Sequence, residues 1–462
     1  MTKKPYQYLS FCICCIIVVF VTGSTSAQSF YGLVQDKNTI TEVFYNPAFA
    51  ISNDAYQVNV GGFSDVAGNN AYSVQKADFN SYNKINSTTA RALWMNTDIL
   101  GPAVSFKVKK KYSFAITTRA RYLLNVDNLN NQVFKLINNN PKDSSIKYTL
   151  DNFAVSTQLF SELNLVYSGY IYQSEDYSLE AGVGVKVLMG VAAVGIGVPH
   201  ADFHVYQDNT INHAHGSANV AFTPYANEWL SVGQPNNALN NGFNNSSLGL
   251  DIGAVYLYTP TNGVYENKEG YTFRLATSIT DIGSINYTAS STTGSYTGNI
   301  DTFDASKINK SSARTYGQSI EQYVSDSIVK QTGLQKKFKV GLPTALRINA
   351  DLKISSGLNT RAYINGSLLL NLRRPSGDKY ASHYVTTFNV TPRYMYKQFG
   401  LGIPFTFNEY KQGYLGMVLY AGPFYIGSGS FGNYLVLKNI TGADVYAGLS
   451  IRIKGKVKER GE

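Results

Sequence analysis

The sequence predicts an all-β protein: a transmembrane antiparallel β-barrel of about 14 strands, roughly 12 to 16, with a short N-terminal segment plugging its lumen. Stretches of about ten residues alternate between apolar and polar positions, and turn residues separate them. Charged residues fall on only one face of these stretches. Tyr (35), Phe (24) and Gly (40) are abundant while charged residues make up only 15%, which is typical of membrane barrels with aromatic girdles.

The N-terminus has the pattern of a secretory signal peptide. Lys3 and Lys4 precede an apolar run from Leu9 to Val21, and small residues follow up to Ala27. A membrane-spanning anchor needs about 20 apolar residues, more than this run supplies. We therefore expect residues 1–27 to be a signal peptide cleaved after Ala27.

Export constrains both the redox chemistry and the partners of the chain. Cys12, Cys14 and Cys15 all lie inside the apolar run, so the exported chain would contain no cysteine. Closed strand pairing, instead of disulfides, would then stabilise the exported chain. The formal charge of +10 favours outer-membrane lipid, lipopolysaccharide or an anionic solute over nucleic acid.

The exported part divides into three predicted regions. Residues 28–52 form the plug, because Asn38 to Ile51 carries an apolar helical pattern that Asn46, Pro47 and Ala48 interrupt. Residues 53–454 form the barrel. Residues 455–462 are a polar C-terminal tail.

The clearest strand pair runs from Val104 to Val108 and, beyond three lysines, from Tyr112 to Leu124. One face of this pair carries no charge. The same division predicts further hairpins and strands at 163–171 with 177–187, 248–258 with 271–279, 346–354 with 362–372, 384–396 with 399–407, and at 414–422 and 445–453. A soluble β-sandwich also alternates, but its strands are usually about five or six residues long.

Basic side chains supply the stronger argument for a membrane. A Lys or Arg facing lipid at the midplane costs roughly 2–4 kcal/mol, so these residues must face the lumen. Those on the predicted luminal face are Arg119, Arg121, Lys186, Arg274, Arg347, Lys353, Arg361, Arg373, Arg393 and Arg452.

Two interpretations of this basic face remain open. The acidic residues expected beside it, Glu180, Asp251 and Asp351, are fewer, which would favour anions in the lumen. Alternatively the cations pair with the plug or with neighbouring carboxylates, such as Asp351 beside Arg347 and Lys353.

Three regions do not have the pattern of barrel wall. Residues 128–151 and 224–247 are rich in Asn and Ser and are predicted to be long exposed loops. Residues 319–330 carry apolar side chains at helical spacing, which predicts a short amphipathic helix.

Several ordered motifs resemble FadL-like outer-membrane barrels, and in particular an uncharacterised family of them from Bacteroidota. They are Tyr45 to Phe49, Ala181 to Gly190, Ile279 to Gly283, Gly341 to Thr344, and Gly422 to Phe424 with Gly427 and Ser428. The resemblance implies a barrel of about 14 strands with an N-terminal segment in the lumen, as in related porins and PorV-like parts of type IX secretion. It implies no activity. The polar end from Lys454 to Glu462 departs from the terminal aromatic residue usual in such barrels.

Candidate chemistry is sparse. His200, His204, His213 and His215 lie within sixteen residues and are either a weak metal-binding candidate or polar residues of a hairpin tip. No nucleophile elbow, zinc-protease motif or phosphate loop is present, and His383 is predicted to be isolated on a strand.

The sequence therefore predicts a non-enzymatic outer-membrane barrel without cofactor. It would be a plugged porin or transporter for a small hydrophobic solute. The alternative is a non-transporting scaffold associated with a secretion or surface-attachment machine.

Overall fold

The computed structural model describes residues 40–51, 56–75, 78–84, 90–108, 111–137, 145–206, 210–224, 244–260, 271–291, 293–304, 331–333, 335–357, 359–377, 379–436 and 439–453. The predicted signal peptide, the polar tail, the helix at 319–330 and most of the loop at 224–247 lie outside these residues. Among the described helices, none is long and apolar enough to cross a membrane.

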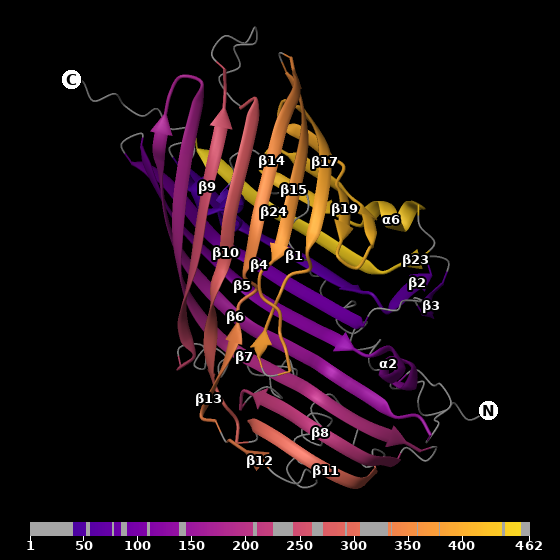
Figure 1. Ribbon diagram of the computed structural model, residues 1–462. Helices are drawn as coiled ribbons and strands as arrows, with labels where there is room; N and C mark the ends of the chain where they lie inside the picture. The colour runs from indigo at the N-terminus through magenta and orange to yellow at the C-terminus, as the bar shows by residue number, and fades with distance from the viewer. Residues whose placement is uncertain are drawn as a thin grey trace.

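The described strands close into an antiparallel barrel of 14, because β1 pairs with β4 on one side and with β24 on the other. Figure 1 shows the long strands wrapping around the molecule at a steep tilt. In order around the barrel, the wall consists of β1 (Tyr56–Asn69), β4 (Arg91–Val108), β5 (Tyr112–Leu129), β6 (Tyr148–Gln173), β7 (Tyr177–Val205), β9 (Ser246–Tyr258), β10 (Phe273–Thr288), β14 (Ala345–Ser356), β15 (Thr360–Asn371), β17 (Thr387–Tyr396), the interrupted strand β18 and β19 (Phe399–Gly402, Phe405–Asn408), the interrupted strand β20 and β21 (Gly413–Leu415, Met417–Ala421), β22 (Phe424–Ser428) and β24 (Gly442–Ile453).

Local chemistry explains the two interrupted strands. Pro404 lies between β18 and β19, where it cannot donate to the strand ladder. Gly416 lies between β20 and β21, and a Cβ there would come within 2.5 Å of Gly429 and of the Ser428 carbonyl. Only glycine fits so close an approach.

Alternation along the strands separates a lipid face from a luminal face. On β5, Phe114 and Ile116 are 40% and 41% exposed, whereas Ala115 and Thr117 between them are 1% and 0% exposed. Exposed aromatic and aliphatic side chains continue onto β6, β17, β18 and β22. Such an apolar band around a closed barrel is what lipid requires, so the predicted fold class is confirmed.

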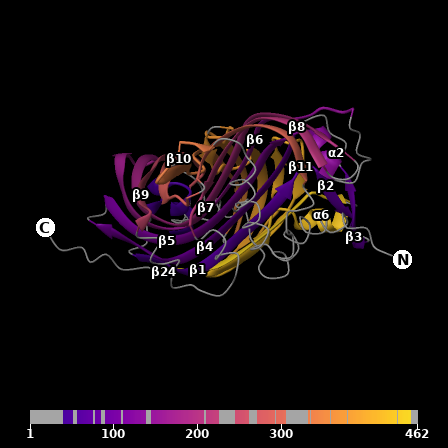
Figure 2. The ribbon, with the colours of Figure 1, turned by 90° about the horizontal axis from the view of Figure 1, so that it is seen from below.

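The two ends of the barrel differ. Tight turns join β4 to β5, β6 to β7, β14 to β15, β17 to β18 and β21 to β22 at one end, where only β9 and β10 have a long connection. At the other end the connections are long, except for the short one between β19 and β20. In membrane barrels short turns mark the periplasmic end and long loops the outer end. Figure 2 shows α2, β3 and α6 gathered at one end, away from β9.

The wall extends well beyond the membrane at the outer end. β6 and β7 are 26 and 29 residues long, although about 9–11 residues suffice to cross a bilayer. β7 forks: residues 177–189 pair with β9, whereas residues 194–205 pair with β8 (Thr210–Phe222). β8 then pairs with β11 (Gly294–Asp304), which pairs with β12 (Gln331–Thr332).

A second fork occurs on β10. Its first part pairs with β14, and residues 284–288 pair with β13 (Lys337–Gly341). β13 in turn runs parallel to β16 (Tyr380–Ala381). A small separate sheet contains β2 (Tyr72–Gln75), β3 (Asp78–Lys84) and β23 (Asn439–Ile440).

The prediction of a loop over 128–151 was wrong in part. The segment contains α2 (Asn131–Ile137), and β6 already begins at Tyr148. Asn130 caps this helix, because its Oδ1 accepts a hydrogen bond from the Gln132 amide at 2.7 Å. Another short helix, α6 (Phe431–Val436), lies between β22 and β23.

Candidate functional site

The described part of the predicted plug, residues 40–51, contains two 3-10 helices inside the barrel, η2 (Ile40–Phe44) and η3 (Pro47–Ala50). All residues from 40 to 51 are buried. Asn46 separates the helices and caps the second one, because its Oδ1 accepts from the Ala48 amide at 2.9 Å. Pro47 follows at the first helical position, where a missing N–H costs nothing.

Asn46 also fastens the plug to the wall. Its Nδ2 donates to the carbonyl of Ala254 at 3.2 Å on β9 and to that of Thr277 at 3.0 Å on β10. Next to it, the Ser278 hydroxyl donates to the Tyr45 carbonyl at 2.6 Å. The Asn-Pro-Ala motif is thus a docking element of the plug.

Glycines on the wall make room for this motif. A Cβ at Gly182 of β7 would lie 2.5 Å from the Ala48 amide nitrogen, and one at Gly253 of β9 would collide with the Asn46 side chain. Because the obstructing atoms at Gly182 belong to backbone, they could not move aside without displacing the plug.

Apolar packing surrounds the rest of the plug. Ile40, Val43 and Phe49 pack in one buried cluster with small wall residues: Ala103, Ala115, Val166, Val255 and Ala276. This part of the wall beneath the plug is therefore apolar.

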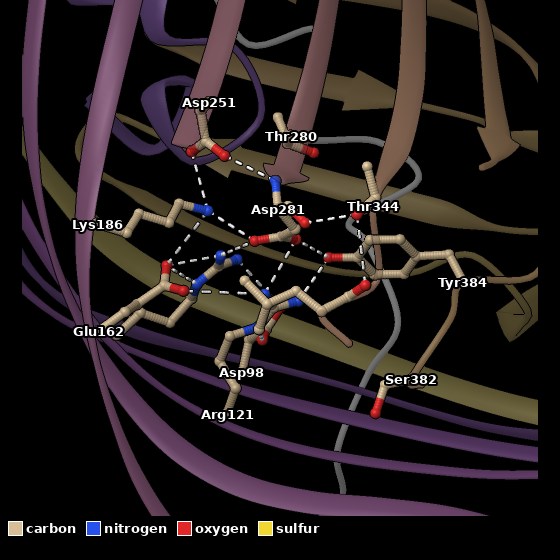
Figure 3. Close-up of polar contacts among 12 residues, drawn as sticks. Asp98, Arg121, Glu162, Lys186, Asp251, Thr280, Asp281, Thr344, Ser382 and Tyr384 are labelled. Atoms are coloured by element: carbon tan, nitrogen blue, oxygen red, sulfur yellow. Dashed lines mark hydrogen bonds and ion pairs between the residues drawn. The ribbon is translucent and has the colours of Figure 1, made fainter. Parts of the chain in front are cut away.

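A buried ion-pair network lies beside the plug (Figure 3). It holds three cations and four carboxylates, each no more than 2% exposed at the side chain. Its members are Asp98, Arg119, Arg121, Glu162, Lys186, Asp251 and Asp281. We call this group the luminal ion-pair cluster.

Strand register brings half of the cluster together. Asp98 faces Arg121 across β4 and β5, and Arg119 faces Glu162 across β5 and β6. Arg121 Nε lies 2.8 Å from Asp98 Oδ1, and Arg119 Nη2 lies 2.7 Å from Glu162 Oε1. Opposite charges at directly paired positions stabilise both strand pairs.

Asp281 is the centre of the cluster. Its carboxylate lies 3.0 Å from Arg121 Nη1 and 2.6 Å from Lys186 Nζ. Lys186 also reaches Asp251 at 2.9 Å, and Asp251 Oδ1 accepts from the Asp281 amide at 2.7 Å.

The backbone places Asp281 there by a bulge. The register of β10 against β9 shifts between Ile279 and Ile282, and Asp281 has a φ of 59°. Aspartate tolerates this left-handed conformation better than most residues. The bulge turns the carboxylate into the lumen, at the point where β10 exchanges β14 for β13.

A segment from the outer end completes the cluster. Residues 382–386, between β16 and β17, fold into the barrel, and we call them the luminal segment. Tyr384 accepts from Arg121 Nη2 at 2.5 Å and donates to Asp281 Oδ2 at 3.0 Å. The plug approaches from the other side, since Arg119 lies over the Phe44 ring at 5.4 Å.

Two further luminal arginines are paired. Arg274 Nη1 lies 3.3 Å from both carboxylate oxygens of Glu42, and its guanidinium stacks over Phe49 and Tyr271. Arg393 lies 2.9 Å from Asp351. Asp351 thus pairs with Arg393 and Tyr271, and the expected placement beside Arg347 and Lys353 was wrong.

Among the described residues, no carboxylate lies within ion-pair distance of Arg347, Lys353, Arg361 or Arg373. The side chain of Arg452 lies outside the described part of the chain. Arg347 lies between the rings of Tyr45 and Tyr384, 5.1 and 5.0 Å away. Lys353 and Arg361 are half-buried near the tight-turn end. Arg373 lies after β15, outside the wall, and donates to the Gly283 carbonyl.

Sequence reasoning missed four luminal carboxylates: Glu42, Asp98, Glu162 and Asp281. The expectation that acidic residues are fewer than basic ones on the luminal face was therefore wrong within the cluster, where four carboxylates meet three cations. Counting in twos along β4 and β6 would have placed Asp98 and Glu162 on the luminal face. Glu42 and Asp281 depend on the plug and the bulge, which carry no such periodic signal.

The histidines do not converge. His200 Nδ1 lies 2.6 Å from Asp151, and the rings of His204 and His213 meet edge to face at 6.3 Å. His213 and His215 are exposed. No group of three metal-ligating side chains occurs in the described part of the chain.

The prediction that His383 is isolated on a strand was wrong. It belongs to the luminal segment, is 5% exposed, and pairs with Asp127. Both ring nitrogens are engaged, so this pair is enclosed and offers no free base to a substrate.

The chain is similar to one protein family and to several solved structures. Residues 45–429 match the model of a family of unknown function, DUF5723. No curated protein matches the chain. Three similar solved structures are a FadL homologue of Pseudomonas aeruginosa (10% identity, 92% of this chain and 98% of that one, TM-score 0.41), the toluene transporter TbuX of Ralstonia pickettii (8%, 94% and 96%, 0.38) and the outer-membrane protease OmpT of Escherichia coli (9%, 87% and 98%, 0.22). At such identities and TM-scores these likenesses carry no argument about what the chain binds or does.

Proposed function

We propose that this chain, which belongs to the DUF5723 family of unknown function, is a plugged barrel of the bacterial outer membrane that admits a small apolar solute when its plug is displaced. The observation that carries the proposal is the apolar wall beneath the plug. Membrane lipid contacts the outer face, and the solute replaces the plug on the inner one.

The surface under the plug suits an apolar solute. Ala103, Ala115, Val166, Val255 and Ala276 are each no more than 4% exposed while the plug covers them. Displacing the plug would expose them to the lumen together. Covering apolar surface contributes about 25 cal/mol per Å², so an apolar solute would recover part of what the plug loses.

Polar contacts fasten the plug to β9 and β10. Asn46 bonds to both strands, Tyr45 bonds to Ser278, and Glu42 pairs with Arg274. On β5, Arg119 lies over the ring of Phe44. Displacement of the plug must break these contacts to expose the apolar wall residues.

Arg347 adds a polar element to this site. It is half-buried between a plug ring and a ring of the luminal segment. A solute with a negative group could place that group there, and this is the form in which an anionic solute would fit the lumen.

Removal of the plug tests the proposal. In the exported chain lacking residues 28–52, we expect higher conductance in planar bilayers and faster entry of N-phenyl-1-naphthylamine, a small apolar fluorescent probe, into cells. Val255→Ser in the same background should slow probe entry and leave conductance unchanged. Unchanged conductance, or probe entry insensitive to Val255→Ser, would contradict the proposal.

A second candidate is a non-transporting scaffold for secretion or surface-attachment proteins. The extension of β6, β7, β8 and β11 beyond the membrane favours it, because this sheet is larger than sealing the barrel requires. Pull-down from detergent-solubilised outer membranes separates the two. A stoichiometric protein partner with no probe entry after plug removal would favour the scaffold.

A further inference from the structure

The luminal segment is an independent obstruction of the barrel. Ser382, His383, Tyr384 and Val385 are each no more than 5% exposed. They follow β16 and precede β17, so they enter from the outer end, whereas the plug is an N-terminal element.

Its backbone is tied to walls on different sides. His383 exchanges two hydrogen bonds with the Asn125 side chain of β5, at 3.0 and 3.1 Å. The Ser382 amide donates to the Gly341 carbonyl of β13 at 3.0 Å. Gln158 of β6 donates to the Ser382 hydroxyl at 2.9 Å.

Further along, the segment packs against β4, which pairs with β5, and against β1, which pairs with β4. Val385 shares a buried cluster with Val66 of β1 and with Ala92 and Trp94 of β4. Trp94 is 4% exposed and stacks on Tyr410 at 4.9 Å. Tyr384 shares another buried cluster with Ala345 of β14 and Leu369 of β15. The segment therefore crosses the lumen from β14 and β15 to the neighbouring strands β1, β4, β5 and β6.

The charge state of His383 follows from its neighbours. Nδ1 lies 2.9 Å from the Tyr384 carbonyl, and Nε2 lies 3.0 Å from each oxygen of Asp127. A carbonyl and a carboxylate only accept hydrogen bonds, so both ring nitrogens must carry protons. The geometry is that of an imidazolium paired with a carboxylate.

We propose that the luminal segment is a second closure of the barrel, latched by the His383 and Asp127 pair and loosened when His383 loses its proton. This closure does not depend on which solute the barrel admits.

The surroundings of His383 include influences that lower its pKa and influences that raise it. Burial lowers the pKa of His383, but its hydrogen bond to Asp127, the charge of Asp127 and the Tyr384 carbonyl together raise that pKa above the ordinary value of 6.5. Arg374 repels the imidazolium but is paired with Glu409, whose carboxylate also accepts from the Thr386 amide at 3.2 Å. The ring of Tyr410 packs nearby against Trp94.

The raised pKa of His383 determines how the stability of the latch depends on pH. A group whose pKa is higher in the folded state stabilises that state fully below its ordinary value, and the contribution disappears as the pH rises through the raised value. The latch should hold at pH 6 and loosen at alkaline pH.

Trp94 offers a direct reporter. The chain has two tryptophans, so Trp229→Phe in the full-length protein leaves Trp94 alone. In lipid vesicles we expect acrylamide quenching of Trp94 to rise several-fold between pH 6 and 9.5. Asp127→Asn should move this transition to lower pH, His383→Gln should abolish it, and His200→Gln, which alters an exposed histidine, should leave it unchanged.

Quenching that stays constant in the parent protein, or the same transition in His383→Gln, would overturn the latch. Retained heat-modifiable migration shows that each variant is folded. Because the reporter requires neither plug displacement nor a solute, its failure leaves the proposed function standing, and failure of the conductance test leaves the latch standing.

Discussion

Arg121 and Asp281 are separated by 160 residues, yet the Nη1 atom of the arginine lies 3.0 Å from the Oδ2 atom of the aspartate, and both side chains are buried. The pair joins β5 to the bulge of β10 across the lumen. It links two parts of the wall that are not adjacent, because β6, β7 and β9 lie between β5 and β10.

Loss of the Asp281 charge should therefore destabilise the whole barrel. In Asp281→Asn, Arg121 and Lys186 keep buried positive charges with fewer counter-ions, and breaking a buried pair in this way costs roughly 3–5 kcal/mol. Urea unfolding from lipid vesicles would measure the loss. Lys147→Gln is the control, because Lys147 is 58% exposed in its pair with Asp202 and such pairs contribute at most about 1 kcal/mol. Equal losses in both variants would contradict the role of the cluster.

Gly182→Ala should expel the plug without altering the barrel. The new methyl group would meet the backbone of Pro47 and Ala48, so we expect protease cleavage within residues 40–51 and higher conductance. Gly366→Ala on β15 is a matched control, since nothing lies within 4 Å of its Cβ position. If both variants stay resistant to protease, the plug is not seated against β7 as described.

Two substitutions separate the two roles of Asn46, which caps η3 and bonds to the wall. Asn46→Asp keeps the oxygen that caps η3 but loses the donor to Ala254 and Thr277, whereas Asn46→Ala loses both. We expect plug accessibility to protease to increase from wild type to Asp and further to Ala. Each lost buried hydrogen bond costs about 1 kcal/mol. An Asp variant as protected as wild type would show that the wall bonds contribute nothing.

Ile116→Arg tests the lipid face. The side chain of Ile116 is 41% exposed in the apolar band, and an arginine near the midplane should lower the stability of the folded barrel in vesicles by roughly 2–4 kcal/mol. Ile146→Arg, at a residue 37% exposed at the outer end, should change the stability little. A reversed order of these losses would mean that the apolar band does not face lipid.

The sequence predicts the wall better than its contents, for a physical reason. Alternation of period two is set locally by the pleat, so residues such as Phe114 and Arg119 reveal their faces along the chain. The contents of the lumen depend on what other segments bring. A bulge turns Asp281 into the lumen, and the packing of the plug brings Glu42 to Arg274. His383 reaches Asp127 because its segment enters the barrel from the outer end. No local sequence pattern predicts any of these three placements.

The forks of β7 and β10 were also beyond prediction. The register of β7 against β6 shifts between Gly190 and Ala192, and beyond this shift β8 replaces β9 as the other partner of β7. This exchange is a property of three strands at once. Periodicity reports which face a residue occupies and not which strand lies beside it.

The most direct test of the account is the amount of detergent bound to the purified full-length protein, measured by light scattering with refractive index and absorbance. A lipid-facing band around a closed barrel predicts a detergent belt on every monomer, aggregation when detergent is removed, and heat-modifiable migration on gels. A monodisperse protein that stays in solution in plain buffer without bound detergent would contradict it.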